Sequence, residues 1–155
     1  MNEGKRPLVI GIGNVLRSDD GAGYRVAEAL HKAIGDQLDV LAVHQLTPEL
    51  ACRVASASRV LFVDASLDPL RSGLKPLEGV QQAPQTSSGV VGLGHRLTPQ
   101  VLLALAQGLY HHRPPAWELL IPAQHLDHGA ALSGLTSEAC TQALSLAQAW
   151  GRSHA

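Results

Sequence analysis

The sequence of 155 residues has no long hydrophobic run, few aromatic residues and almost no net charge. No apolar stretch approaches the ~18 residues of a membrane-spanning helix, and the strand-like stretch 8–14 is too short for a signal peptide. We therefore expect no membrane association. Because 12 Lys and Arg balance 13 Asp and Glu, no basic field is present to attract nucleic acid, and we expect no nucleic-acid partner.

Cysteines and aromatic residues are also scarce. The two cysteines, Cys52 and Cys140, form neither a C-x-x-C pair nor a metal-type spacing, which favours a reducing, cytoplasmic compartment. With only 3% aromatic residues, the core must consist mainly of Leu, Val, Ile and Ala. The length suits one domain, residues 1–155, and no apolar stripe is left over for self-association, so we expect a monomer.

Apolar segments bounded by glycines or by helix-start signals alternate along the chain. The pattern predicts short buried strands at 8–12, 40–43, 60–63 and 118–121 and an edge strand at 74–77. Helices are predicted to begin near Asp19, Thr47, Thr98 and Thr136. This alternation predicts an α/β fold: a three-layer sandwich in which helices flank both faces of a twisted, mainly parallel sheet of about five strands.

Polar residues that could carry chemistry fall where such a sheet binds ligands, beyond the carboxyl ends of its strands. Asn14, Asp19 and Asp20 follow the first strand, Asp64 closes the third, and His95 precedes the helix that starts at Thr98. Two carboxylates and an imidazole suit a first-row divalent metal. Each residue also has a simpler interpretation: a helix cap for the paired aspartates, a turn for Asp64 and a solvated surface group for His95.

The same residues lie in motifs that resemble a known family. The string GIGNVLRSDDGAG at 11–23 resembles the opening motif of the hydrogenase maturation proteases, the endopeptidases that trim the large subunit of nickel–iron hydrogenases. The resemblance continues through QLTPELA at 45–51, FVDA at 62–65 and GHRLTPQVLL at 94–103, and it ends at Leu132–Ser133. It therefore spans nearly the whole chain.

The resemblance implies a metal-dependent endopeptidase with the same α/β fold. It implies that Asp20, Asp64 and His95 bind the metal and carry catalysis. We also expect Asn14 and Asp19 to contact the substrate, with capping of its own loop as the alternative role for Asn14. The partner is then an immature hydrogenase large subunit already loaded with nickel, from which a C-terminal extension is removed. Nickel would arrive with this substrate, although another divalent metal is an alternative. The glycines of the opening motif, at 13, 21 and 23, would let the partner's backbone approach closely.

Two features depart from the family pattern. Many members carry Glu where this chain has Asp20, whose side chain is shorter by one C–C bond, roughly 1.5 Å. The segment 122–131 does not match well. Its residues His125, Asp127 and His128 could bind metal, or the segment could be a polar loop that faces water or the partner.

Mechanism and competing functions follow from what the sequence lacks. No G-x-S-x-G or H-E-x-x-H motif is present, so a metal acting as a Lewis acid on the scissile carbonyl or on water is the expected chemistry. A non-catalytic nickel chaperone and a peptidase of other specificity remain alternatives. A nucleotide-binding module is disfavoured because Leu16 replaces the third glycine of the fingerprint. We expect the loop 65–94 to recognise the partner.

Overall fold

The structure is a computed structural model that describes residues 4–68, 70–78, 97–129 and 131–153. These residues form one five-stranded sheet of order β2-β1-β3-β5-β4. The strands are β1 (Leu8–Ile12), β2 (Asp39–Val43), β3 (Val60–Ser66), β4 (Gly73–Pro76) and β5 (Ala116–Pro122). All neighbours pair in parallel except β4, which is antiparallel to β5 at one edge. The predicted mainly parallel sheet is confirmed.

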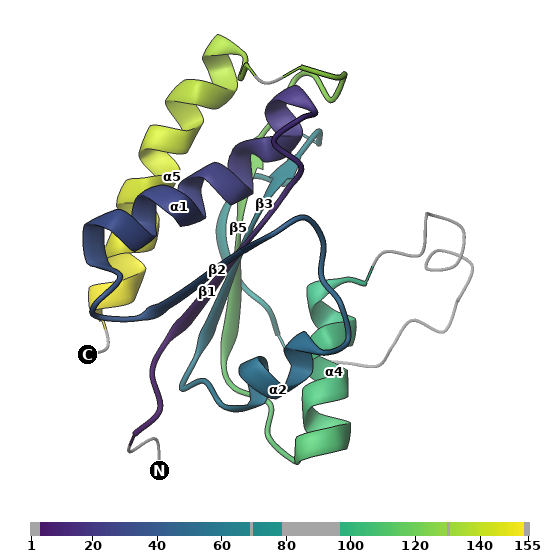
Figure 1. The fold of residues 1–155 in the computed structure, drawn as a ribbon, viewed down its shortest axis with the longest axis vertical. Coiled ribbons are helices and arrows are strands. Elements are labelled where there is room, and N and C mark those ends of the chain that lie inside the picture. The colour runs from purple at the N-terminus through teal and green to yellow at the C-terminus, as the bar shows by residue number, and fades with distance from the viewer. Residues whose placement is uncertain (1–3, 69, 79–96, 130, 154–155) are drawn as a thin grey trace.

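Helices cover both faces of this sheet, as predicted. Helices α1 (Ala22–Ile34) and α5 (Gly134–Ser153) lie on one face, and α2 (Leu50–Ala55) and α4 (Pro99–Tyr110) lie on the other (Figure 1). Successive strand residues enter two separate cores, so that Ile10 packs on the α2 and α4 side and Val9 on the α1 and α5 side. Burial on both faces explains why the strands are almost uniformly apolar.

Strand β3 is longer than predicted. It extends to Ser66 rather than stopping at residue 63, because β5 continues to pair with it as far as Pro122. Asp64 therefore lies inside the strand instead of closing it. The tertiary pairing, which local sequence does not reveal, sets the end of this strand.

Two helices begin later than predicted because a tight turn precedes each. Ser18–Gly21 forms a 3₁₀ turn, η1, and α1 begins only after it. Thr47 and Pro48 likewise make a turn, in which the carbonyl groups of both residues accept backbone N–H groups three residues ahead, and α2 begins at Leu50.

The other two helices begin at or near the predicted positions. Thr98 caps α4 as predicted, since its Oγ1 accepts the Val101 N–H at 3.1 Å and Pro99 occupies the first helical position. Helix α5 begins slightly earlier than predicted, after Ser133, whose Oγ accepts the Thr136 N–H at 3.2 Å. Within the described ranges, no helix has both the length and the apolar character needed to cross a membrane.

Candidate active site

The candidate site lies at the carboxyl ends of β1 and β3, which are neighbours in the sheet. Gly11 of β1 pairs with Val63 of β3, and Asp64 lies one residue beyond that pair. The loop that carries Asn14 and Asp20 starts where β1 ends, at Ile12. The parallel register therefore brings the opening motif and the β3 aspartate to the same edge, as the sequence predicts.

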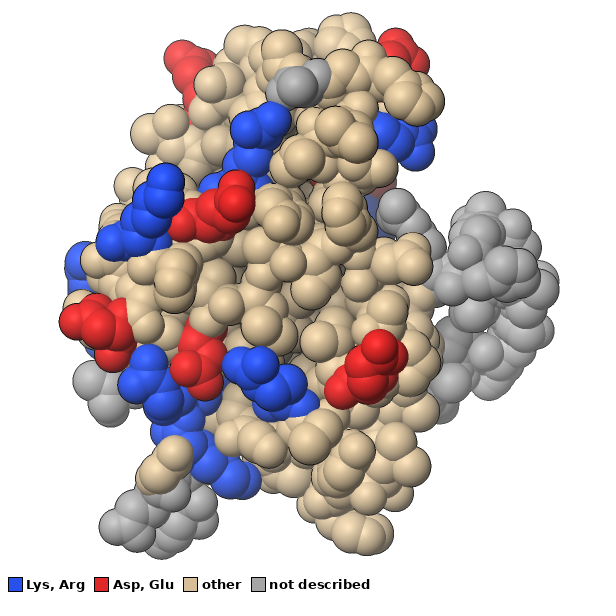
Figure 2. All heavy atoms as spheres, viewed as in Figure 1, with Lys and Arg blue, Asp and Glu red and all other residues tan. Residues whose placement is uncertain are grey.

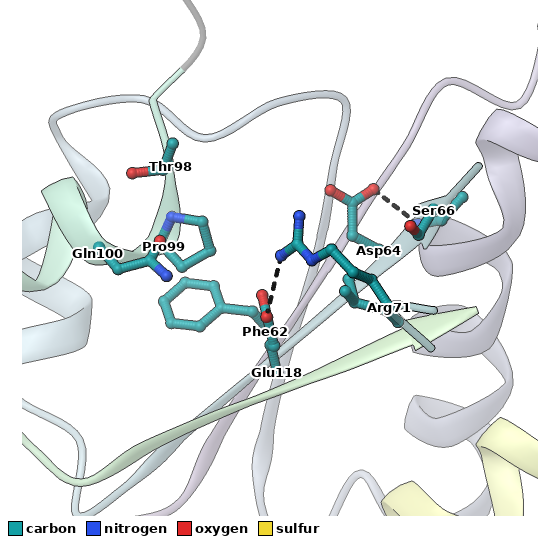
Figure 3. A pocket seen from close by; sticks show the side chains of 10 residues that line it. Phe62, Asp64, Ser66, Arg71, Thr98, Pro99, Gln100 and Glu118 are labelled. Carbon is teal, nitrogen blue, oxygen red and sulfur yellow. Dashed lines mark hydrogen bonds and ion pairs between the residues drawn. The ribbon is translucent and has the colours of Figure 1, made fainter. Parts of the chain in front are cut away.

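Asp64 borders two hollows at this edge. The larger, of about 190 Å³, lies between the strand residues Phe62 and Glu118 and the start of α4 at Thr98 and Pro99 (Figure 3). The smaller, of about 40 Å³, lies toward β1 and β2 and has Ile12, Gln45, Leu46, Asp64, Leu97 and Pro99 as its lining. Pockets for cofactors typically hold ~300–1,000 Å³, so the larger hollow suits a side chain or a short peptide segment instead.

An ion pair that the sequence analysis missed lines the larger hollow. Arg71 Nη2 lies 3.5 Å from Glu118 Oε1, and the two side chains are 58% and 13% exposed (Figure 3). Glu118 had a signal in the sequence, because it is a carboxylate inside an otherwise apolar strand. Arg71 had none, since it lies in the connection between β3 and β4, far from any motif.

Asp20 lies at the same edge and is nearly buried, at 9% exposed. Its Oδ2 accepts the backbone N–H of Asn14 at 3.1 Å, and the Asp20 carbonyl accepts the same N–H at 3.2 Å. Among the described residues, no hydrogen bond is made to Asp20 Oδ1. One carboxylate oxygen is thus committed to the loop, while the other is left for a ligand.

Asp19 is entirely buried, and its carboxylate is used within the protein. It accepts N–H groups from Gln124, His125 and Ser133 at 2.7, 3.0 and 2.8 Å, and the Ser133 hydroxyl at 2.9 Å. Burial alone raises the pKa of Asp19, but these hydrogen bonds to the charged form outweigh it and hold the pKa well below its ordinary value. The interpretation of Asp19 as a substrate ligand does not fit a carboxylate with no exposed surface and four internal donors.

Asn14 also serves its own loop. Its Oδ1 accepts the Leu16 N–H at 2.9 Å, which closes an Asx turn directly after β1. The side-chain oxygen is therefore occupied, and only the amide N–H groups are left for a substrate. Of the two proposed roles, loop capping is the one for which the structure provides a contact.

The glycines of the opening motif are packed against the chain itself, so the interpretation that they admit a partner's backbone is wrong. A Cβ on Gly23 would lie 2.3 Å from the Val63 carbonyl oxygen, and one on Gly13 would lie 2.1 Å from the Asp20 carbonyl oxygen. Gly21 is similarly close to Val15. These glycines let α1 and the η1 turn approach the carboxyl ends of β1 and β3.

The segment 122–131 braces the opening motif through its backbone. The carbonyl groups of His125, Leu126 and Asp127 accept bonds from the Asp19 N–H, the Arg17 Nε and the Ser18 hydroxyl. No cluster of three potential metal ligands occurs among the described residues, so His125, Asp127 and His128 do not form one. The alternative that these three residues bind metal is therefore not supported.

His95 lies outside the described residues, so the proposed set of Asp20, Asp64 and His95 is seen only in part. Asp20 and Asp64 are both at the edge where the resemblance places them. Two carboxylates at one edge of the sheet, of which Asp64 borders the hollow, are compatible with a divalent metal.

The structure also weighs against nucleotide binding. In that alternative, a phosphate would lie in the turn after β1, at the N-terminus of the following helix. Here Gly13 and the carbonyl group of Asp20 fill that turn, and the two buried aspartates immediately precede α1. A phosphate would meet like charge there.

Comparison with known proteins agrees with these observations. No family model matches the chain. It is 28% identical over 155 residues to the hydrogenase expression/formation protein HupD of Rhizobium leguminosarum bv. viciae, a match that covers 94% of this chain and 76% of HupD. The chain resembles the hydrogenase maturation proteases. The resemblance that the motifs indicated is thus confirmed along most of the chain.

Solved structures of that family have the same fold. The [NiFe] hydrogenase maturation protease HybD from Thermococcus kodakarensis superposes with a TM-score of 0.65 at 21% identity, covering 95% of this chain and 99% of HybD. The hydrogenase maturating endopeptidase HybD from E. coli gives 0.63 at 20% identity, covering 96% of this chain and 93% of that protein. The sheet and its flanking helices therefore have the fold of the hydrogenase maturation proteases.

Proposed function

We propose that this protein is an endopeptidase that removes the C-terminal extension of a nickel-loaded nickel–iron hydrogenase large-subunit precursor. The observation that carries the proposal is the match to HupD along 94% of the chain, together with the shared fold of named maturation proteases. The position of Asp64 beside an open hollow at the functional edge of the sheet supports it.

In this proposal nickel is part of the substrate. Asp20, Asp64 and His95 would hold it when the precursor docks, and it would supply Lewis-acid chemistry at the scissile carbonyl or at a water. Asp20 supports this role through Oδ1, which accepts no hydrogen bond among the described residues. The contribution of His95 rests on the resemblance alone. The shorter side chain of Asp20, compared with Glu, places the ligand oxygen closer to the loop backbone.

The hollow beside Asp64 would take the peptide segment next to the scissile bond. Its volume of about 190 Å³ fits a side chain, and its lining includes the Phe62 ring and the Arg71–Glu118 pair. An exposed cysteine nucleophile at this edge is not part of the proposal. Burial raises the pKa of Cys140 to about 11, so its thiol remains protonated at neutral pH. In this proposal a water molecule is the attacking group.

The setting that fits this substrate is the cytoplasm. Both cysteines, Cys52 and Cys140, are unpaired, as expected in a reducing compartment.

The test is the intact mass of the precursor from the same organism, nickel-loaded and nickel-free, before and after incubation with the protein. We expect a C-terminal peptide to be lost from the loaded form alone. Asp64→Asn should abolish this loss while the melting temperature stays unchanged, because an Asn oxygen can still accept the Ala65 N–H that Asp64 Oδ1 accepts at 2.8 Å. Asp36→Asn, an exposed site after α1, is the matched control and should process normally.

Other outcomes would change the assignment. Normal processing by Asp64→Asn would remove Asp64 from the active site. Stable binding of the loaded precursor without any mass change would favour the nickel chaperone, and absence of both would indicate a different substrate.

A further inference from the structure

Glu118 is a nearly buried carboxylate that the fold itself uses little. It lies in β5, an interior strand of the sheet, and its side chain is 13% exposed beside the larger hollow. Among the described residues it accepts no hydrogen bond, and its ion pair with Arg71 is 3.5 Å long. Removing a carboxylate from water costs free energy, which one long ion pair offsets poorly. The stability of the sheet therefore does not explain Glu118, and its position indicates a role in the hollow.

Strand register places Glu118 on the same face of the sheet as Asp64. Glu118 pairs with Phe62 of β3, and Asp64 lies two residues further along that strand. Because alternate residues of a strand face the same side, all three side chains point toward the layer of α2 and α4. All three line the larger hollow, so two carboxylates border the same space.

Arg71 holds a guanidinium in that space. Two cations lie near Glu118, of which Lys75 is directly opposite it in β4 but is exposed and forms no ion pair within the described ranges. Arg71 does form the pair, and Figure 3 shows its guanidinium directed between Asp64 and Glu118. A guanidinium carries several N–H donors, and that of Arg71 donates no hydrogen bond to any residue that the structure describes. These donors are available to a bound group.

The charges of the lining select the chemistry of that group. The described lining has two carboxylates and one guanidinium, so a carboxylate of the substrate would meet two like charges. A cationic side chain would have to displace Arg71 from Glu118. A neutral carbonyl oxygen meets neither obstacle, and it accepts a charge-assisted hydrogen bond from a guanidinium. Acidic and basic side chains are interspersed over the face seen in Figure 2, which provides no field of one sign to favour a charged group there.

We propose that Arg71 binds a backbone carbonyl oxygen of the substrate peptide in the hollow beside Asp64, and that Glu118 positions the guanidinium for this contact. The proposal rests on the proposed function, which brings the C-terminal peptide of the precursor to this edge. A peptide bound in the hollow loses water from its carbonyl oxygens, and each of them then needs a donor. Arg71 lies in the segment 65–94, for which the sequence predicts a recognition role.

The first test compares Arg71→Gln with the control Arg152→Gln. Arg152 is an exposed arginine in the last turn of α5, a turn that contacts Arg59 at the amino end of β3, the opposite edge of the sheet. The Kd for nickel-loaded precursor is measured by calorimetric titration in a non-cleaving Asp64→Asn background. Loss of a charge-assisted hydrogen bond should raise Kd about tenfold or more in Arg71→Gln, while Arg152→Gln should not change it.

The rate of peptide release by proteins that retain Asp64 provides a second readout. Arg71→Gln should raise KM with kcat unchanged, because a contact away from the reacting atoms stabilises the bound substrate and the transition state equally. All variants should keep the wild-type melting temperature, because Arg71 is exposed and Gln has the shape of Glu.

Glu118→Gln tests the positioning role. Gln lacks the charge that attracts the guanidinium, so this variant should raise Kd by a smaller factor than Arg71→Gln. If Glu118 acts only through Arg71, adding Glu118→Gln to Arg71→Gln should raise Kd no further. Free guanidinium below denaturing concentrations should restore binding to Arg71→Ala, and should restore it less when Glu118→Gln is also present. A purely structural Glu118 would not affect this rescue.

The remaining outcomes separate this proposal from the proposed function. An unchanged Kd in Arg71→Gln would remove the contact, and additive effects of the two substitutions would remove the positioning role. Tighter binding by Arg71→Gln with weaker binding by Glu118→Gln would show instead that Glu118 binds a cationic side chain of the substrate. If the wild type binds the precursor without cleaving it, the Kd comparison still tests Arg71, and the endopeptidase proposal fails. If it neither binds nor cleaves, both proposals fail.

Discussion

The buried carboxylate of Asp19 should be a large contributor to stability, and Asp19→Asn is the change that tests it. The substitution keeps the size and shape of the side chain but replaces one acceptor oxygen with an NH₂ donor. In the wild type, both carboxylate oxygens accept bonds, three at Oδ2 and one at Oδ1. Asn therefore cannot satisfy all four donors in either of its two amide orientations.

The cost follows from the better orientation. If the Asn oxygen takes the place of Oδ2, it keeps the Gln124, His125 and hydroxyl bonds, and the Ser133 N–H faces the new NH₂ group. A hydrogen bond to a charged group is worth ~1.5–3 kcal/mol, and a stranded buried donor costs ~1–3 kcal/mol. Because the lost bond and the stranded donor describe the same change, the two figures are not added in full. We expect Asp19→Asn to lower the free energy of unfolding by about 2–4 kcal/mol. For a chain of this size that lowers the melting temperature by roughly 5–15 °C.

The pH dependence provides a second readout with a definite sign. The folded-state pKa of Asp19 is lowered, so the wild type gains stability from this group above the unfolded-state pKa, which is about 3.9. That gain is lost as pH falls toward the folded-state pKa. The difference in unfolding free energy between the wild type and Asp19→Asn should therefore be constant from about pH 5 to 7 and shrink below about pH 4.

Urea denaturation across this pH range, with thermal melting at neutral pH, measures both effects. Asp36→Asn, at an exposed site, should melt within about 2 °C of the wild type, since exposed substitutions rarely exceed ~0.5 kcal/mol. Equal melting of Asp19→Asn and Asp36→Asn would refute the reasoning. So would a stability difference that does not decrease in acid.

Two further predictions concern the same scaffold. Arg59 is buried and donates to the Trp150 and Gly151 carbonyls at 2.7 and 3.3 Å, with its guanidinium carbon 4.2 Å from the Trp150 ring. Arg59→Met should lower the free energy of unfolding, measured in urea, by about 2–4 kcal/mol, and Arg59→Lys should lower it by less. An Arg59→Met variant as stable as the wild type would contradict this prediction. Gly23→Ala should lower the free energy of unfolding by about 3 kcal/mol or more, because the new Cβ would clash with carbonyl oxygens of β1 and β3. Its control, Gly108→Ala, has open space in α4 and should be stabilised by about 0.5–1 kcal/mol, and loss of stability there would refute the packing argument.

The layered fold could be predicted from sequence because its signals are local. Apolar runs, glycine stops and the Thr98–Pro99 cap each reflect contacts within a few residues. The end of β3 could not be predicted, since pairing with β5, more than fifty residues away, extends it to Ser66. The Arg71–Glu118 pair depends equally on distant pairing, which brings the two residues into the same hollow.

Asp19 and Asp20 show which part of the site the sequence alone could not resolve. Adjacent carboxylates look equivalent in sequence, and both could face a ligand. Segment 124–133, more than a hundred residues later, encloses one with hydrogen-bond donors and leaves an oxygen of the other for a ligand. Asp19, which is structural, can be distinguished from Asp20, the candidate ligand, only by the packing of that distant segment against the loop.

This division determines how activity losses in the opening motif should be interpreted. Asp19 and Gly23 hold the edge of the sheet together, while Asp64 borders the hollow and Asp20 lies in the loop after β1 at the same edge. A variant of either kind would lose processing, so activity alone cannot distinguish a catalytic residue from a structural one. The melting temperature can: Asp19→Asn should lose activity together with stability, and Asp64→Asn should lose activity alone. A stable Asp19→Asn variant without activity would instead return Asp19 to the substrate-binding role that its burial argues against.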